Sequence, residues 1–172
     1  IIGHSMGGYV ALAFGELYPE NLKNLILLNA STRADSEERK LNRDRAINIV
    51  KKNINVFINM AINNLFSSEA KKLFTNEIDV ILSEALQTSV QGAVAALEGM
   101  KTRPDREVLL HFGPYSKLVI TGNLDTIASE KEVMEETKDA EVTTHILACG
   151  HMAPLEKQEE VIKLIQSFLK KK

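Results

Sequence analysis

The opening eight residues constrain the fold more than any other stretch of the chain. They read IIGHSMGG, an apolar strand end followed by a serine with a glycine two residues to either side and then by the start of a helix. A serine stands exposed on so sharp a turn only where its neighbours leave room for the backbone. We expect Gly3 and Gly7 to leave that room, with further space from Gly8. The pattern is typical of a nucleophile elbow and makes Ser5 a candidate catalytic serine. The alternative is a glycine-rich turn whose serine has no chemical role.

Composition narrows the class of protein. The chain has 172 residues, of which 44% are hydrophobic and 26% charged, so it is long enough for one domain with a proper core. A formal net charge of −2 provides no overall field for nucleic acid or anionic lipid. No apolar run approaches the roughly 20 residues of a membrane span. The single cysteine, Cys149, excludes an intrachain disulfide and favours a reducing, cytoplasmic compartment. A targeting signal upstream of Ile1 would not be visible.

Hydrophobic spacing predicts strands and helices in alternation. An unbroken apolar run at 25–28 is typical of a parallel strand covered on both faces. Further strands are predicted at 117–121 and 142–149. Helices are predicted over 6–18, over 130–138 and from 157 onward, with a long helical region over about 36–100. This order predicts an α/β fold with a parallel sheet and flanking helices. We divide the chain into a first core segment (1–34), a helical insert (35–103) and a second core segment (104–172).

Three residues with complementary chemistry follow predicted strands. Ser5, Asp125 and His151 each come shortly after a strand, where the chemistry of parallel sheets is found. A serine hydroxyl is a poor nucleophile near neutral pH unless a base takes its proton and a carboxylate orients that base. The three therefore form a candidate catalytic set. The alternative for Asp125 is an ordinary turn aspartate.

Other histidines and acids fit less well. For His4, beside the candidate nucleophile, a local structural or access role is favoured over that of a base. His145 lies in the middle of a predicted strand, where a structural role is expected, and His111 has no placed partner. The remaining acids considered lack the loop after a strand that Asp125 has: Asp79, Asp105 and Asp139. Cys149 reads as a small buried residue at a strand end.

Three blocks of sequence resemble a known superfamily. The stretches GHSMGG at 3–8, GNLD at 122–125 and GHMAPLE at 150–156 resemble the signature blocks of the α/β-hydrolases, closest to their esterase, lactonase and carbon–carbon hydrolase branch. The chain order Ser5, Asp125, His151 is also that of this superfamily. One departure is Ser129, where members often have proline. The resemblance implies a hydrolase core with a helical cap at 35–103.

The resemblance also implies a mechanism. Ser5 would attack an ester-like carbonyl, with His151 as base, Asp125 as its orienting carboxylate and the N–H of Met6 in the oxyanion hole. The substrate would be a small molecule with an apolar acyl or alcohol part, bound below the cap by residues that the sequence does not indicate. No metal or cofactor is expected, and no nucleic-acid partner. The alternatives are a non-hydrolytic member, such as a haloperoxidase or a lyase, and a non-catalytic hydrolase-like binding protein or fragment.

The start of the chain carries a further expectation. The sequence opens inside a strand, so we expect the first strands of the family's sheet to be missing, with the loop that usually provides a second oxyanion donor. An unpaired edge beside the strand before Ser5 would then favour self-association. A protein of these residues alone is expected to be weak or inactive as a catalyst.

Overall fold

The chain forms two compact units. The computed structural model describes residues 1–170, so the last two residues of the predicted segment 104–172 lie outside the described part. The first unit comprises Ile1–Arg33 together with the chain from Asp105 onward, and the second is Ala34–Pro104. The first unit contains the sheet and all three candidate catalytic residues.

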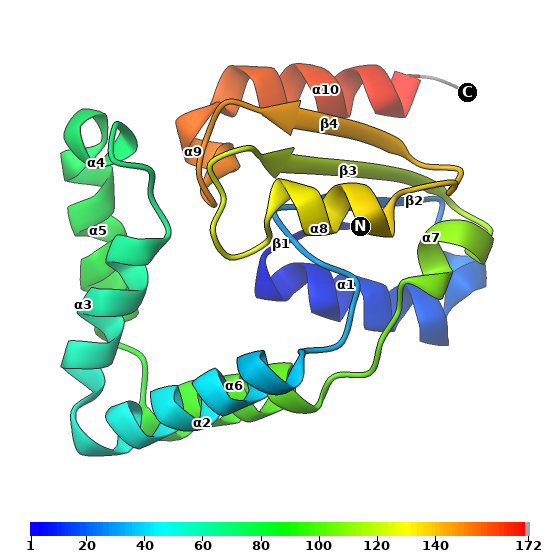
Figure 1. Ribbon diagram of the computed structural model, residues 1–172. Helices are drawn as coiled ribbons and strands as arrows, with labels where there is room; N and C mark the ends of the chain where they lie inside the picture. Colours follow the sequence, from blue (N-terminus) through cyan, green and yellow to red (C-terminus); the bar gives the residue numbers. More distant parts are fainter. Residues whose placement is uncertain (171–172) are drawn as a thin grey trace. The chain divides into compact units, whose positions relative to one another are not determined.

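The sheet of the first unit has four strands that run parallel. The strands are β1 (Ile2–His4), β2 (Asn24–Leu28), β3 (Ser116–Gly122) and β4 (Thr143–Leu147), and they pair in that order (Figure 1). In the register, Leu27 lies opposite Val119 on the neighbouring strand. The α/β fold with a parallel sheet that the sequence predicts is confirmed.

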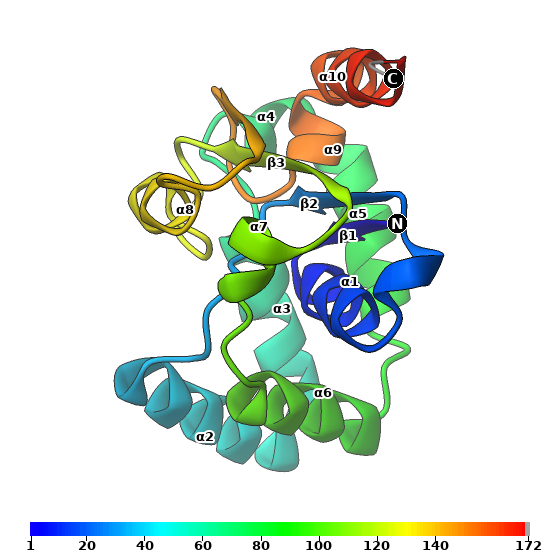
Figure 2. The same ribbon diagram turned by 90° about the vertical axis from the view of Figure 1, so that its right-hand side faces the viewer.

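Helices cover both faces of this sheet. One face carries α1 (Met6–Leu17), α7 (Val108–Phe112) and α8 (Glu130–Glu136), and the other carries α9 (Ala153–Glu156) and α10 (Gln158–Lys170) (Figure 2). A short 3₁₀ helix, Pro19–Asn21, connects α1 to β2.

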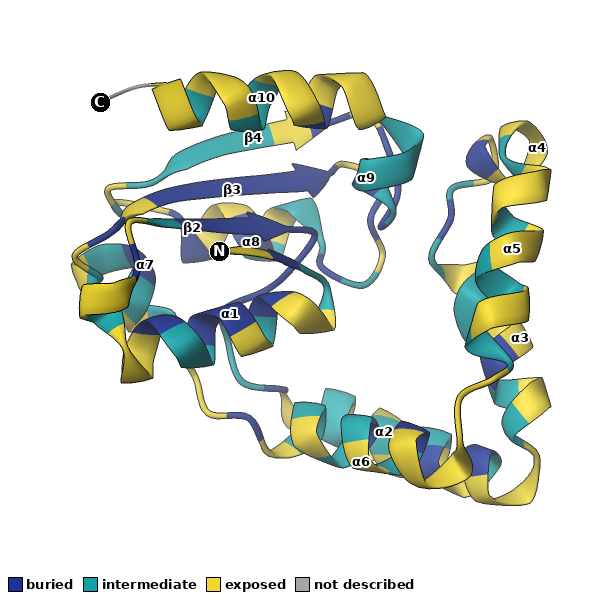
Figure 3. Ribbon diagram, turned by 180° about the vertical axis from the view of Figure 1, so that it is seen from behind, coloured by how far each residue is buried: buried dark blue, intermediate teal, exposed yellow. Residues whose placement is uncertain are grey.

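The side chains of β2 show why helices are needed on both sides. Leu25 and Leu27 pack into the cluster on the α1 face, whereas Ile26 and Leu28 pack into the cluster on the α10 face. All four are at most 4% exposed. Successive side chains of a strand point to opposite faces, so an unbroken apolar run requires cover on both. Figure 3 shows the resulting contrast between the buried inner strands and the exposed outer surfaces of the helices.

The second unit is helical among its described residues. Its helices are α2 (Glu37–Lys52), α3 (Ile54–Asn64), α4 (Ala70–Leu73), α5 (Thr75–Ala85) and α6 (Val90–Thr102). Side-chain oxygens of the preceding residues accept N–H groups from the first turn of three of these helices: Ser36, Asn53 and Ser89. The helical character agrees with the spacing of the sequence, while the role of this stretch as a cap stays a prediction.

Polar and apolar contacts together stabilise the second unit. The apolar contact between α2 and α6 is made by Ile47 and Val50 against Ala93 and Leu97. Asp35, just before α2, accepts from Arg43 at 3.0 Å and from Arg103 at 2.7 Å.

Within residues 1–170, no single helix is long and apolar enough to cross a membrane. The helices α5 and α6 pass that test of length and composition only when they are taken together, and they are bent by 101° relative to each other.

Two glycines of the opening motif leave no room for a side chain. A Cβ on Gly3 would lie 2.5 Å from the carbonyl oxygen of Gly7, and a Cβ on Gly8 would lie 2.5 Å from the Cβ of Ala30. By contrast, a Cβ on Gly7 would meet no atom within 4 Å among the described residues. The expectation that Gly7 relieves a clash was therefore wrong. The close approach of α1 to β1 and to the chain after β2 involves Gly3 and Gly8.

We expect Gly3→Ala to destabilise the protein and Gly7→Ala not to. The first change forces a methyl group against backbone atoms that cannot move independently, which costs roughly 1–3 kcal/mol. The second adds a methyl in open space at the start of a helix and changes stability by no more than about 1 kcal/mol. Free energies of unfolding from urea titrations test this difference. Equal losses in the two variants would contradict it.

Candidate active site

Ser5 lies at the junction of β1 and α1 in an uncommon backbone conformation. Its φ is 53° and its ψ is −122°, and it directly precedes the first residue of α1. A positive φ is costly for a residue with a side chain and persists where surrounding contacts impose it. The N–H of Ser5 donates to the carbonyl of Leu28 at 3.0 Å, which holds the turn against the end of β2. The structure thus has the strained turn that the motif predicts.

Backbone contacts bring the loop after β3 to the loop after β4. The N–H of Asn123 donates to the carbonyl of Leu147 at 2.9 Å, and that of Leu124 donates to the carbonyl of Cys149 at 3.0 Å. A Cβ on Gly122 would lie only 2.2 Å from the Cys149 carbonyl oxygen, so the two loops touch through their backbones. This contact places Asp125 beside Gly150 and His151, the two residues that follow Cys149 in the chain.

The structure brings the three predicted residues into one hydrogen-bonded chain. His151 Nδ1 lies 2.8 Å from Asp125 Oδ2, and His151 Nε2 lies 2.7 Å from Ser5 Oγ. A carboxylate only accepts, so Nδ1 carries the proton and donates to Asp125. The unprotonated Nε2 of the neutral ring then accepts from the Ser5 hydroxyl. This is the arrangement in which an imidazole removes a proton from a serine.

The Asp125 carboxylate is buried yet fully hydrogen-bonded. Oδ1 accepts the N–H groups of Ile127 at 2.8 Å and Ala128 at 3.0 Å, and Oδ2 accepts from His151 and from the amide Nδ2 of Asn29 at 3.0 Å. Burial alone would raise the pKa of Asp125, but the hydrogen bond and charge of His151, followed by the other donors, bring the net pKa below its ordinary value. Asp125 is therefore ionised and able to stabilise a charged His151.

Two polar residues near the set were not assigned to it from the sequence. Asn29 directly follows β2, and besides its contact with Asp125 its Nδ2 donates to the Gly150 carbonyl at 3.2 Å. His4 Nε2 lies 2.8 Å from the carbonyl oxygen of His151. A signal for Asn29 was available, because it is the first polar residue after an apolar strand, at the same sheet edge as the predicted site.

The remaining residues considered in the sequence analysis are placed as follows by the structure. Met6 is the first residue of α1, so its N–H has no intrahelical acceptor, and its place in an oxyanion hole stays a prediction. Burial, as the main cause, raises the pKa of Cys149 to about 12, so it stays a thiol. His111 lies in α7, and His145 lies in β4 opposite Ile120. Residues 1–170 contain no group of three or more His, Cys, Asp or Glu side chains that could hold a metal ion.

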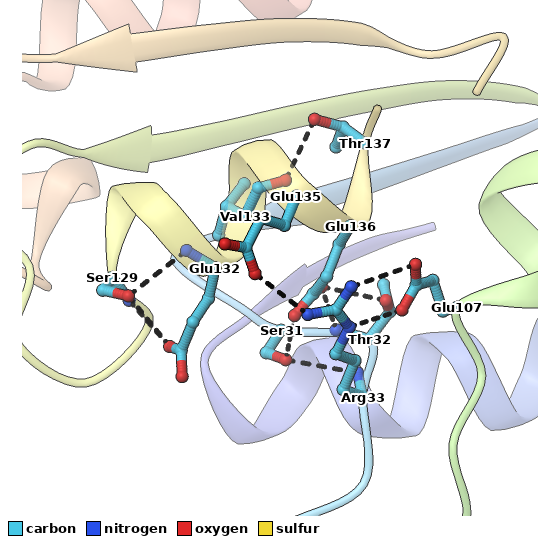
Figure 4. A network of polar contacts seen from close by, with 10 residues as sticks. All are labelled: Ser31, Thr32, Arg33, Glu107, Ser129, Glu132, Val133, Glu135, Glu136 and Thr137. Carbon is cyan, nitrogen blue, oxygen red and sulfur yellow. Dashed lines mark hydrogen bonds and ion pairs between the residues drawn. The ribbon is translucent and has the colours of Figure 1, made fainter. Parts of the chain in front are cut away.

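A second buried carboxylate supports the loop that begins at Asn29. Glu136 of α8 accepts from the Ser31 hydroxyl, from the Thr32 N–H at 2.7 Å and from the Thr32 hydroxyl at 2.9 Å. Figure 4 shows these contacts beside Arg33, which pairs with Glu107 and Glu135. The loop is thereby tied to α8 along several consecutive residues.

Comparisons with known proteins agree with this fold. A family model described as alpha/beta hydrolase fold matches residues 1–158. The chain is similar to a solved thermophilic esterase from Thermogutta terrifontis, with 31% identity, a TM-score of 0.90, and cover of 99% of this chain and 64% of that one. An enol-lactonase from Burkholderia xenovorans has the same fold, with 19% identity, a TM-score of 0.87, and cover of 98% of this chain and 64% of that one.

A further relative is named for a different reaction. The chain is 26% identical over 188 residues to a 2-hydroxy-6-oxononadienedioate/2-hydroxy-6-oxononatrienedioate hydrolase from Burkholderia vietnamiensis. That alignment covers 99% of this chain and 62% of the relative. The chain thus spans less than two thirds of the length of the proteins it matches.

We expect Glu136→Leu and Glu136→Gln to differ strongly in stability. Leucine leaves the Thr32 N–H and neighbouring hydroxyls without their acceptor, at roughly 1–3 kcal/mol for each buried group left unpaired. Glutamine keeps an acceptor oxygen for Thr32 and offers Ser31 a donor. Thermal and urea unfolding of both variants measure the difference. Equal stability of the two would show that the hydrogen bonds contribute little.

We also expect the difference in stability between wild type and Glu136→Gln to depend on pH. Burial is the main cause that raises the pKa of Glu136 above its ordinary 4.5, and the hydrogen bonds from Ser31 and Thr32 offset it only in part. The folded state thus holds this proton more tightly than the unfolded chain. The stabilisation is complete below pH 4.5 and is lost as the pH rises through the folded-state pKa. The unfolding free energy of wild type should fall relative to Glu136→Gln over that range, and a pH-independent difference would contradict the assignment.

Proposed function

Because the chain belongs to the alpha/beta hydrolase fold family, we propose that it carries the Ser–His–Asp part of a serine hydrolase acting on an ester-like carbonyl. The observation that carries the proposal is the continuous hydrogen-bonded chain from Ser5 through His151 to the buried Asp125. A structural role alone does not require a half-buried serine in a strained conformation at the end of that chain.

In the first step His151 acts as the base. Its Nε2 takes the Ser5 proton while Oγ attacks the carbonyl carbon of the substrate, and the negative charge that develops on the carbonyl oxygen is stabilised by backbone N–H groups including that of Met6. Asp125 stabilises the protonated ring through Nδ1. The leaving alcohol receives the proton from Nε2 as the tetrahedral intermediate collapses to an acyl-enzyme.

In the second step water replaces the alcohol. His151, neutral again, takes a proton from the water as the water oxygen attacks the acyl carbon, and a second tetrahedral intermediate forms. The proton then passes from His151 to Ser5 Oγ as the carboxylic acid leaves. Ser5, His151 and Asp125 return to their starting states, so the proposed cycle can begin again.

The proposed substrate is a small molecule with an apolar acyl or alcohol part. The similarity to the Thermogutta esterase, at 31% identity, supports ester hydrolysis. Hydrolysis of a carbon–carbon bond is the second candidate, and the similarity to the Burkholderia vietnamiensis hydrolase favours it. We propose that the helical unit Ala34–Pro104 influences which of these substrates binds.

We expect Ser5→Ala to remove ester turnover in the full-length protein. Loss of the nucleophile lowers kcat by roughly 10⁴–10⁶-fold in a serine hydrolase. A matched control is Ser116→Ala, since Ser116 begins β3 at the opposite end of the strand from the site. Hydrolysis of p-nitrophenyl acetate by the two variants measures the effect. Near-normal turnover by Ser5→Ala would identify a different nucleophile and sink the proposal.

A substrate panel distinguishes the two candidate activities. We expect the full-length protein to cleave short-chain aryl esters with a higher kcat/KM than lactones or vinylogous diketones. Each reaction should depend on Ser5, because all three begin at a carbonyl group. Selective cleavage of the diketone, with esters untouched, would favour carbon–carbon hydrolysis instead.

A further inference from the structure

Two side chains from neighbouring strand ends bind consecutive carbonyl groups around His151. The Nδ2 of Asn29 donates to the carbonyl of Gly150 at 3.2 Å, and the Nε2 of His4 contacts the carbonyl of His151 at 2.8 Å. We propose that His4 and Asn29 are positioning residues that together clamp the Gly150–His151 segment and so hold the His151 ring between Ser5 and Asp125. The inference rests on the proposed function, in which His151 is the base.

The orientation of the Asn29 amide is determined by its neighbours. Both hydrogens of Nδ2 are used, one toward Asp125 Oδ2 and one toward the Gly150 carbonyl. A flipped amide would place Oδ1 against two acceptors, which is repulsive. The residue has no exposed surface, and its φ of 48° is of the kind that asparagine tolerates better than most residues. Asn29 therefore links the carboxylate and the segment that carries the base through one rigid group.

The contact of His4 also shows which of its ring nitrogens carries the proton. A carbonyl oxygen only accepts, so the Nε2 of His4 carries a hydrogen and donates it to His151. The two imidazole rings lie 5.3 Å apart at an angle of 44°, so His4 also supports the ring of His151 from the side of the elbow. Burial, the main cause, lowers the pKa of His4 and keeps it neutral beside a ring that becomes charged in the reaction.

Such a clamp matters because the ring of His151 must satisfy two partners at once. Its nitrogens make contacts of 2.8 Å and 2.7 Å on opposite edges, to Asp125 and to Ser5. A displacement of the ring by about 1 Å can reduce a rate by about 10²-fold. The segment lies in a loop, and the side chains that hold its carbonyls come from β1 and from the end of β2. The clamp thus fixes the position of His151 relative to the sheet.

His4→Phe and His4→Gln form the first test. Phenylalanine keeps an aromatic ring but cannot donate, whereas glutamine keeps an N–H donor. With p-nitrophenyl acetate and full-length protein, we expect His4→Phe to lower kcat by about 10–100-fold with little change in KM, and His4→Gln to recover most of that loss. A wild-type kcat in His4→Phe, or equal losses in the two variants, would overturn the role of the donor.

The second test asks whether the two residues act on one segment. Asn29→Gly removes the amide while accepting the positive φ. If both side chains clamp the same segment, Asn29→Gly combined with His4→Phe should lower kcat by clearly less than the product of the two single effects. Independent, multiplicative effects would overturn the clamp. Thermal unfolding of each variant confirms that folded protein is being compared.

A spectroscopic signal separates this inference from the proposed function. The proton between His151 Nδ1 and Asp125 should give a low-field ¹H resonance in the wild-type protein, and Asp125→Asn identifies it by its loss. We expect His4→Phe to shift or broaden this resonance and His4→Gln to preserve it. An unchanged resonance in His4→Phe would overturn the inference. Full ester turnover by Ser5→Ala would overturn only the proposed function, since the resonance does not depend on turnover.

Discussion

Parallel pairing of the four strands is the constraint on which the rest of the structure depends. It places the carboxyl ends of β1, β2 and β3, and the loop after β4, at one edge of the sheet. Ser5, Asn29, Asp125 and His151 come from four different strand ends, and none is close to another in sequence. Their contacts of about 3 Å exist because the register brings the strand ends level. The close approach of the backbone at Gly3, Gly8 and Gly122 is a second condition for the same geometry.

Two buried carboxylates near this edge differ in their electrostatics. The pKa of Asp125 is lowered because a histidine that can become cationic and several further donors face it. The pKa of Glu136 is raised because burial outweighs the hydrogen bonds from Ser31 and Thr32 and the charge of Arg33. The first carboxylate is suited to stabilising a positive charge during a reaction. The second holds the loop after β2 by hydrogen bonds, and the folded protein is more stable when Glu136 is protonated.

Much of the architecture could be predicted from hydrophobic pattern. The continuous apolar run at 25–28 predicts a strand covered on both faces, and β2 is such a strand. The short helix α7 at Val108–Phe112 was not predicted, because a single turn leaves almost no periodic signal. Gly7 was wrongly assigned a steric role, since the motif marks where glycines occur but not which of their hydrogens face other atoms. That distinction depends on how α1 lies against β1 and on the position of Ala30.

The sequence by itself determined the fold class and the identity of Ser5, Asp125 and His151 as candidates. It could do so because a strand end, a turn and the spacing of glycines are local properties of the chain. Only the tertiary structure decided that these three side chains meet, that Asn29 and His4 hold the carbonyls around His151, and that Glu136 anchors the loop after β2. Those contacts join residues between 26 and 147 positions apart in the chain, and hydrogen-bond geometry between such residues is set by strand register and helix packing. No local pattern encodes them, because the partners become neighbours only when the sheet has formed.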